Sequence, residues 1–284
     1  MIQKAHFTLL FCLMIGFSST AQKYGVYRKK QMFLGISGGI NFSLPTVTGK
    51  FHVLEPTDKG GFVSDKKYDN LFRNSGSQFA VHWMYSFSHH LSLTVQPGYQ
   101  TNGMNYFSSF AWSDSTENSG FKRELHHRQK FSYITLPVLI RWDFTLNQFS
   151  PYVKLGVQAD FRHQGSKVIR YDNTIDQAET KSQLFVTNEA GIKEHMNRFN
   201  IGVVAGFGVT YFTKYAAFGI ETNVNFRFLK IIDDETRFAD YSGFTMQYLD
   251  VFDQFMLPTL NLQLTAKVPI TRALTLNILR KKRY

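Results

Sequence analysis

Hydrophobic and polar residues alternate in eight separate stretches of the chain. In 133–144, every second residue from Ile134 to Phe144 is apolar, and Thr135, Arg141 and Asp143 stand between them. A period of two is that of a β-strand with one apolar and one polar face. The eight stretches are 32–42, 78–87, 91–99, 133–144, 153–161, 199–211, 218–228 and 259–266. We therefore predict an all-β chain of eight antiparallel strands.

The polar face of these stretches carries charges beside many glycines. Six charged residues recur on it: Arg141, Asp143, Lys154, Asp160, Glu221 and Arg227. In a closed barrel they would point into the lumen, where they must pair because an unpaired buried charge is costly. Glycines would relieve crowding there. We predict a lumen charge network made by these six residues.

The apolar face is large and rich in aromatic residues. A soluble β-sandwich also alternates, so alternation alone does not decide the fold. On a water-facing sheet, however, such a face would promote aggregation. In a transmembrane barrel it faces lipid, with aromatic girdles at the two membrane interfaces. The predicted girdle residues are Trp83, Tyr99, Trp142, Phe144, Tyr211 and Phe228.

The connectors between the stretches alternate between long and short. The long ones are 43–77, 107–130, 162–197 and 229–254; the short ones are 88–90, 145–150 and 213–216. Outer-membrane barrels have long extracellular loops and short periplasmic turns, and a sandwich has no reason to follow that rule. We therefore predict an up-and-down transmembrane barrel whose N-terminus and C-terminus both lie in the periplasm. A strand-like segment, 271–279, leaves a ten-strand barrel as the alternative.

The two ends of the chain add a signal and basic segments. Residues 1–21 combine Lys4, a short apolar run and small residues before Gln22, which is typical of a signal peptide. The sole cysteine, Cys12, lies inside it. We assign 22–31 to a periplasmic N-terminal segment, 32–268 to the barrel and 269–284 to a basic periplasmic tail.

Composition supports a barrel over other classes. Aromatic residues make up 16% of the chain, yet mean hydropathy is only −0.22. After residue 22 there is no apolar run of the roughly 20 residues that a membrane helix needs. The net charge of +11 is concentrated in short runs at both ends. Those runs suit anionic lipid headgroups or a periplasmic partner, or are simply solvated termini, and do not indicate nucleic-acid binding.

Three motifs resemble the PorT-like outer-membrane β-barrel family. They are FLGISGGINFS at 33–43, YITLPVLIRWDF at 133–144 and SPYVKLGVQADF at 150–161. The resemblance covers most of 32–268 and implies a small barrel in the outer membrane of a Gram-negative cell. For some members it implies an association with type IX protein secretion.

Candidate chemistry is sparse. His126, His127 and His163 with Asp160 could form a surface metal site, but their spacing matches no metal motif and exposed histidines are the simpler explanation. A lipid-modifying enzyme would draw on Ser108, Ser109, His126, His127 and Asp160, although no nucleophile motif is present. We expect no catalytic residue, cofactor or metal.

The functional prediction is a non-enzymatic barrel that serves as a scaffold or accessory subunit of an envelope complex, in protein secretion or outer-membrane assembly. Outer-membrane lipid and a protein are its expected partners. An eight-strand lumen is filled by side chains, so we expect no conducting pore. Aromatic residues in the long connectors leave a second hypothesis, a surface-binding or adhesion barrel. A lipid-modifying enzyme is the third.

Overall fold

The computed structural model describes residues 30–51, 62–63, 66–114, 119–144, 148–177, 180–213, 215–238 and 250–270. The predicted signal peptide, almost all of segment 22–31 and segment 271–284 lie outside these described residues. No helix among them is long and apolar enough to cross a membrane.

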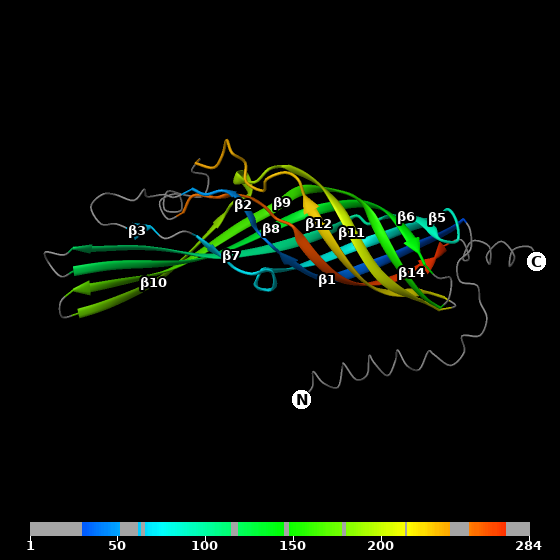
Figure 1. The fold of residues 1–284 in the computed structure, drawn as a ribbon, viewed down its shortest axis with the longest axis horizontal. Helices are drawn as coiled ribbons and strands as arrows, with labels where there is room; N and C mark the ends of the chain where they lie inside the picture. Colours follow the sequence, from blue (N-terminus) through cyan, green and yellow to red (C-terminus); the bar gives the residue numbers. More distant parts are fainter. Residues whose placement is uncertain are drawn as a thin grey trace, which may run out of the picture.

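Eight antiparallel strands close into a ring (Figure 1). In ring order they are β1 (Gln31–Ser43), β5 (Ser75–Ser86), β6 (Leu91–Val95) continued by β7 (Gly98–Asp114), β8 (Ser119–Asp143), β9 (Phe149–Gln177), β11 (Phe199–Phe212), β12 (Ala217–Arg227) and β14 (Thr259–Pro269). Pairing of β1 with β14 closes the ring, from Phe33 opposite Pro269 to Ser43 opposite Thr259. The predicted all-β, eight-stranded up-and-down barrel is confirmed.

The third strand of the ring is interrupted at Gln96 and Pro97. Proline has no backbone N–H, so it cannot donate to a neighbouring strand. Its carbonyl still accepts a hydrogen bond from Val81 N–H at 2.9 Å, and Gln96 N–H donates to Pro137 O at 3.1 Å. The strand therefore keeps its course through the break, and β6 and β7 count as one strand of the ring.

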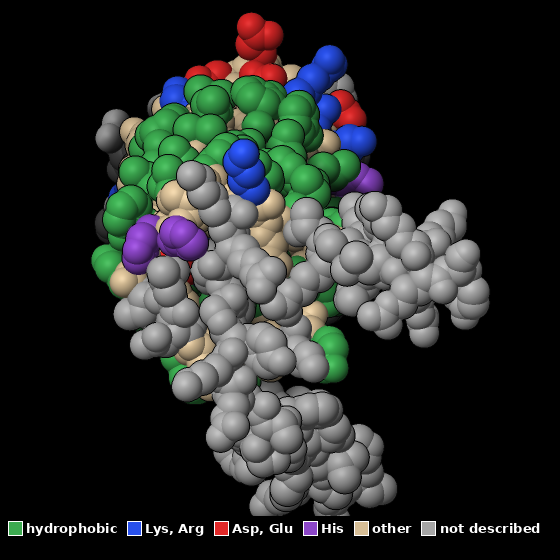
Figure 2. Space-filling model, turned by 90° about the vertical axis from the view of Figure 1, so that its right-hand side faces the viewer, with side chains coloured by type: hydrophobic (Ala, Val, Ile, Leu, Met, Phe, Trp, Pro, Cys, Tyr) green, Lys and Arg blue, Asp and Glu red, His purple; other side chains and the backbone are tan. Residues whose placement is uncertain are grey.

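The outer surface of the ring is apolar and its interior is polar. Ile140 of β8 is 57% exposed and Leu264 of β14 is 65% exposed, whereas Arg141 beside the first and Gln263 beside the second are buried. Hydrophobic side chains cover much of the outer wall when the barrel is viewed from the end with the short turns (Figure 2). The arrangement is the reverse of a soluble domain and matches the two faces predicted from the alternation.

The prediction that 107–130 and 162–197 are loops is wrong over most of their length. β7, β8 and β9 run on far beyond the ring, and β10 (Thr180–Gly191) pairs with the end of β9. Figure 1 shows these four strands projecting to the left, past the rest of the barrel. They form a sheet in the order β10, β9, β8, β7, which we call the projecting sheet.

The described parts of the other two long connectors contain short elements. In 43–77 these are β2 (Thr46–Gly49), β3 (Phe62–Val63), β4 (Lys67–Tyr68) and a 3-10 turn, Leu71–Arg73. β3 and β4 pair with β7 at one edge of the projecting sheet. β2 pairs with β13 (Gln254–Met256), which lies just before β14. A second 3-10 turn, Lys193–His195, links β10 to β11. These connectors bring chain segments together at one end, which we call the long-connector end.

Candidate functional site

Three layers of inward-facing side chains follow one another along β8. Arg141 and Asp143 lie in the ring, Tyr133 and Phe131 come next, and His127 lies beyond them; all five are buried. A polar lumen is thus followed by an apolar layer and then by a second polar layer at the long-connector end.

The lumen brings the six predicted charged residues together as three ion pairs. Arg141 Nη2 lies 2.5 Å from Asp143 Oδ1. Lys154 Nζ lies 2.9 Å from Glu221 Oε2, and Arg227 Nε lies 2.6 Å from Asp160 Oδ2. Every one of these side chains is at most 4% exposed. Each charge therefore has a partner of opposite sign, as burial requires.

Sequence reasoning missed several lumen residues that complete this layer. The Tyr152 hydroxyl donates to Glu221, and its ring lies under the Arg141 guanidinium with a 3.5 Å separation from the ring centroid. His82 Nε2 is 2.8 Å from Ser37 Oγ, and Lys267 is also buried. His82 and Ser37 stand on the polar face of predicted strands. Tyr152 and Lys267 each lie one residue outside the predicted stretches 153–161 and 259–266, in phase with the same alternation, which was the available signal.

Gly208 makes room for Tyr152 across the β9–β11 pairing. A Cβ atom at this position would lie only 2.7 Å from the Tyr152 hydroxyl oxygen. Side chains fill most of the lumen, and a cavity lined by residues such as Gln100, Gln158 and Asn223 measures about 30 Å³. That volume is about two to three times the roughly 10–15 Å³ that one water molecule needs.

The predicted girdle residues lie on the outer surface at two heights. Trp142 and Phe144 are exposed near the short turns, where Tyr211 packs against Phe149. Tyr99 and Phe228 are exposed at the opposite end of the ring. Trp83 is half-buried on β5, three residues before the strand ends.

An apolar layer covers the lumen at the long-connector end. It joins β7 and β8 to the turns before β11 and β14, and none of its side chains is more than 4% exposed. We call it the plug: Met104, Tyr106, Phe131, Tyr133, Ile192, Met196, Ile231, Ile232, Phe252, Phe255 and Leu257. The plug is tied to the lumen because Arg227 Nη1 donates to Leu257 O at 3.0 Å.

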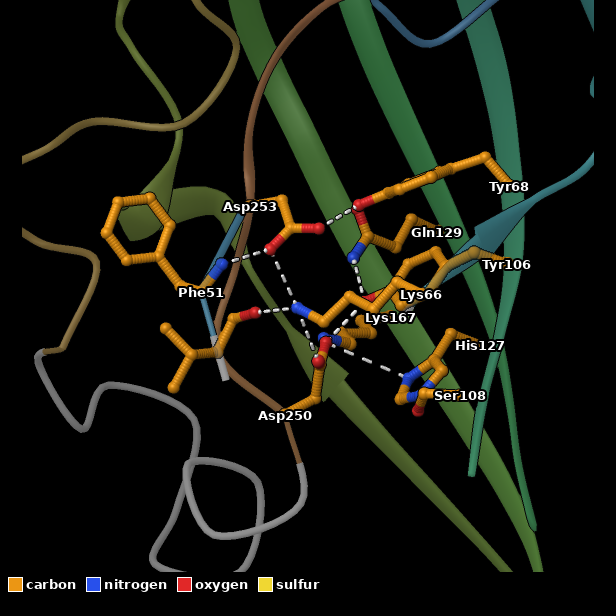
Figure 3. Close-up of polar contacts among 11 residues, drawn as sticks. Phe51, Lys66, Tyr68, Tyr106, Ser108, His127, Gln129, Lys167, Asp250 and Asp253 are labelled. Carbon is orange, nitrogen blue, oxygen red and sulfur yellow. Dashed lines mark hydrogen bonds and ion pairs between the residues drawn. The ribbon is translucent and has the colours of Figure 1, made fainter. Parts of the chain in front are cut away.

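A second polar layer lies beyond the plug, centred on two aspartates that precede β13 (Figure 3). Asp250 forms an ion pair with Lys66 at 2.9 Å, and it also accepts hydrogen bonds from Lys167 and from the Tyr106 hydroxyl. Asp253 accepts from Lys66 at 3.0 Å. We call this group the Asp250 cluster. It fastens a connector to three strands of the projecting sheet.

Further bonds complete the Asp250 cluster. The Tyr68 hydroxyl donates to Asp253 at 2.5 Å, and the Phe51 N–H donates to it at 2.8 Å. The Gln129 amide donates to the Tyr106 oxygen at 3.1 Å. Two lysines thus balance two aspartates in a buried site. Sequence reasoning missed this cluster because its acids lie in a connector without alternation.

The charges of the Asp250 cluster set its protonation states. Burial would raise the pKa of the Asp250 carboxyl, but Lys167 and Lys66 outweigh burial and hold that pKa well below its usual range. Burial lowers the pKa of His127 to about 3, and the two lysines add to this lowering while Asp250 opposes it. His127 is therefore neutral and Asp250 ionised across the physiological range.

Ser108, His127 and Asp250 lie in the order of a hydrolase triad. Ser108 Oγ is 3.0 Å from His127 Nε2, and His127 Nδ1 is 3.8 Å from Asp250 Oδ2. In a working triad the carboxylate stabilises the imidazolium that forms when histidine takes the serine proton. Here the Asp250 carboxylate already forms ion pairs with two lysines, which disfavour a third cation beside it. This arrangement provides a poor general base.

The other two histidines of the predicted metal and enzyme sites, His126 and His163, lie apart from His127. His126 is exposed on the opposite face of β8 from His127, and His163 packs edge-on against Tyr99. Asp160 lies in the lumen, paired with Arg227. Within the described ranges, no group of three or more histidine, cysteine, aspartate or glutamate side chains is arranged to hold a metal ion.

The sequence matches the family described as the outer membrane protein beta-barrel domain over residues 21–233 of 284, more than half of the chain. The chain belongs to this outer membrane protein beta-barrel family. Membership places it in the outer membrane, as predicted from the apolar outer face and the aromatic girdle.

No curated protein sequence matches this member of the outer membrane protein beta-barrel family significantly. Among solved structures, OprG of Pseudomonas aeruginosa is 11% identical with a TM-score of 0.35, covering 86% of this chain and 99% of its own. Neisserial surface protein A is 11% identical with a TM-score of 0.32, covering 84% and 96%. Ail of Yersinia pestis is 11% identical with a TM-score of 0.28, covering 84% and 99%. These similarities are too low to carry a functional conclusion.

Proposed function

We propose that this protein is a non-enzymatic outer-membrane scaffold that holds a partner protein of an envelope complex on its projecting sheet. The observation that carries the proposal is the free edge of β10. β10 pairs with β9 along Thr180–Gln177 to Gly191–Ser166, and no other described strand pairs with its second edge.

A free strand edge suits an extended protein segment. Its backbone N–H and C=O groups are unpaired and can bond to an added strand. Main-chain hydrogen bonds then supply affinity while alternate side chains supply specificity. The edge belongs to a sheet anchored by the Asp250 cluster, so it is held in place before the partner arrives.

The filled lumen favours a scaffold function rather than a channel function. The three ion pairs and the plug lie across the only route along the barrel axis that the described residues enclose. We propose that the charge network keeps the lumen closed and that the aromatic girdle fixes the height of the barrel in the bilayer. The poor general base at His127 supports a non-enzymatic role.

The proposal also covers the orientation of the barrel in the membrane and the cellular process in which it takes part. Long connectors of outer-membrane barrels are extracellular, so the projecting sheet would lie outside the cell. The PorT-like motifs at 133–161 support a place beside a protein-secretion machinery. Because the same edge could hold a ligand from outside the cell, an adhesion barrel is the second candidate.

Native gel electrophoresis of the solubilised outer membrane tests the scaffold. We expect the wild-type protein to migrate in a complex with a stoichiometric partner, and a variant with 172–186 replaced by a short turn to migrate as a monomer. A variant with 113–120 shortened should keep the complex because the β10 edge is intact. Heat-modifiable migration controls for barrel folding in each variant.

The results separate the two candidates. A wild-type protein that stays monomeric in repeated mild extractions contradicts the scaffold. If such a monomer captures an external ligand, and the 172–186 variant does not, the adhesion barrel is correct.

A further inference from the structure

The outer surface of the projecting sheet carries a stripe of basic residues. On β8, His126, Arg128 and Lys130 are exposed, while the residues between them are buried. On β9, Arg170 is exposed and lies directly opposite His126. Side chains on one face of paired strands lie about 5 to 8 Å apart, so the four residues form one continuous surface. We call it the basic stripe.

Few acids counter the basic stripe. Among the described residues, Glu124 is paired with Lys122 at 2.5 Å. Glu189 on β10 lies opposite Val168 and forms no ion pair with a described residue. No described carboxylate forms an ion pair with Arg128, Lys130 or Arg170. The stripe therefore keeps an excess of positive charge that is open to solvent.

The basic stripe continues the lipid-facing surface of the same strand. Ile134 of β8 and Phe144, the residue after its end, bound the apolar face. Ten residues at roughly 3.3 Å each, tilted by about 40°, give a band about 25 Å high. Lys130 stands four residues above Ile134, which puts it about 10 Å beyond the apolar band by the same geometry. Polar headgroups occupy that level of a bilayer.

We infer that the lower end of the basic stripe, at Lys130 and Arg128, binds the phosphate groups of membrane lipid headgroups. Arginine forks and the lysine ammonium match phosphate oxygens, and the apolar band below would hold the acyl chains. With the orientation proposed above, the lipid is a phosphorylated glycolipid of the outer leaflet. The binding test below does not depend on orientation or on the protein partner.

Native mass spectrometry of the full protein in detergent, titrated with diphosphorylated lipid A, measures this binding. The test variant is Arg128→Gln, Lys130→Gln. The control removes the same charge from exposed cations outside the stripe: Lys67→Gln, Arg73→Gln. One cation near an anionic lipid surface contributes about a fivefold change in affinity. We expect a loss of about twenty-five-fold in the test variant and less than about fivefold in the control.

Three outcomes would overturn the inference. The first is equal affinity of the test and control variants, with both showing heat-modifiable migration. The second is equal binding of lipid A from which both phosphates have been removed. The third is displacement by inorganic phosphate at concentrations similar to that of the lipid, which would assign the stripe to free anions. We expect no such displacement because free phosphate lacks the acyl anchor.

Discussion

Replacing Asp250 by asparagine tests whether the Asp250 cluster holds the long-connector end together. The change preserves shape but removes the charge that balances Lys167, which is 0% exposed and has no other described carboxylate within ion-pair distance. Lys66 keeps its bond to Asp253. One buried cation is thus left uncompensated, and breaking a buried pair in this way costs about 3 to 5 kcal/mol.

Urea unfolding in lipid vesicles, followed by tryptophan fluorescence, gives the free energy of unfolding. Asp69→Asn is the matched control, because Asp69 pairs at 3.7 Å with Arg73, whose side chain is 76% exposed. We expect it to lose at most about 1 kcal/mol. The double variant Asp250→Asn, Lys167→Met removes the whole pair and should recover most of the loss.

The pH dependence of the free energy of unfolding gives a second test of the Asp250→Asn variant. Burial already lowers the pKa of Lys167, and Asp250 opposes that lowering. Without Asp250, the folded-state pKa of Lys167 falls further below its unfolded value, so the unfolded chain binds more protons. The loss of stability should therefore shrink between pH 7 and pH 9. If Asp250→Asn loses no more stability than Asp69→Asn, or the double variant is no more stable than the single one, the cluster does not stabilise this end.

Three further predictions follow from single positions. The pKa of His127 is lowered to about 3, below its unfolded value of about 6.5. The free energy of unfolding should therefore fall by up to about 1.4 kcal/mol for each pH unit below pH 6.5. A His127→Gln variant whose free energy of unfolding, measured by urea titration, depends on pH in the same way contradicts this. Gly165→Val should loosen the plug, because a Cβ atom there lies 2.4 Å from Met196 Sδ; unchanged hydrogen exchange in 192–196 contradicts it. Gly208→Val should displace Tyr152 from the lumen and destabilise the barrel by about 1 to 3 kcal/mol, and an unchanged urea midpoint would argue against tight packing there.

The faces of the barrel were predictable from the sequence because one physical cause sets them. Lipid outside and a packed lumen inside impose opposite polarity on successive residues, as with Ile140 and Arg141. The six charges were likewise expected to pair with one another, because unpaired charge in a narrow interior is costly. Both inferences need only the period of two. Which partners meet, such as Lys154 of β9 with Glu221 of β12, was not predicted.

The projecting sheet was not predictable by that route. Beyond the apolar band, the outer face of β8 no longer meets acyl chains, so His126, Arg128 and Lys130 replace apolar residues. The inner face there carries His127 and Gln129 within the Asp250 cluster. Polar residues then stand on both faces, alternation disappears, and the segment has the composition of a loop. Sequence reasoning likewise chose Asp160 as a neighbour for the histidines, because only the folded chain brings Asp250 to His127.

Hydrogen exchange of the β10 amides tests the central claim, that the free edge of the projecting sheet holds a protein partner. The measurement compares native outer membranes with the purified monomer. We predict that alternate amides of Thr180–Gly191, those pointing away from β9, are protected in the native membrane and exchange quickly in the monomer. Equal exchange at these amides in both samples would contradict the proposed function.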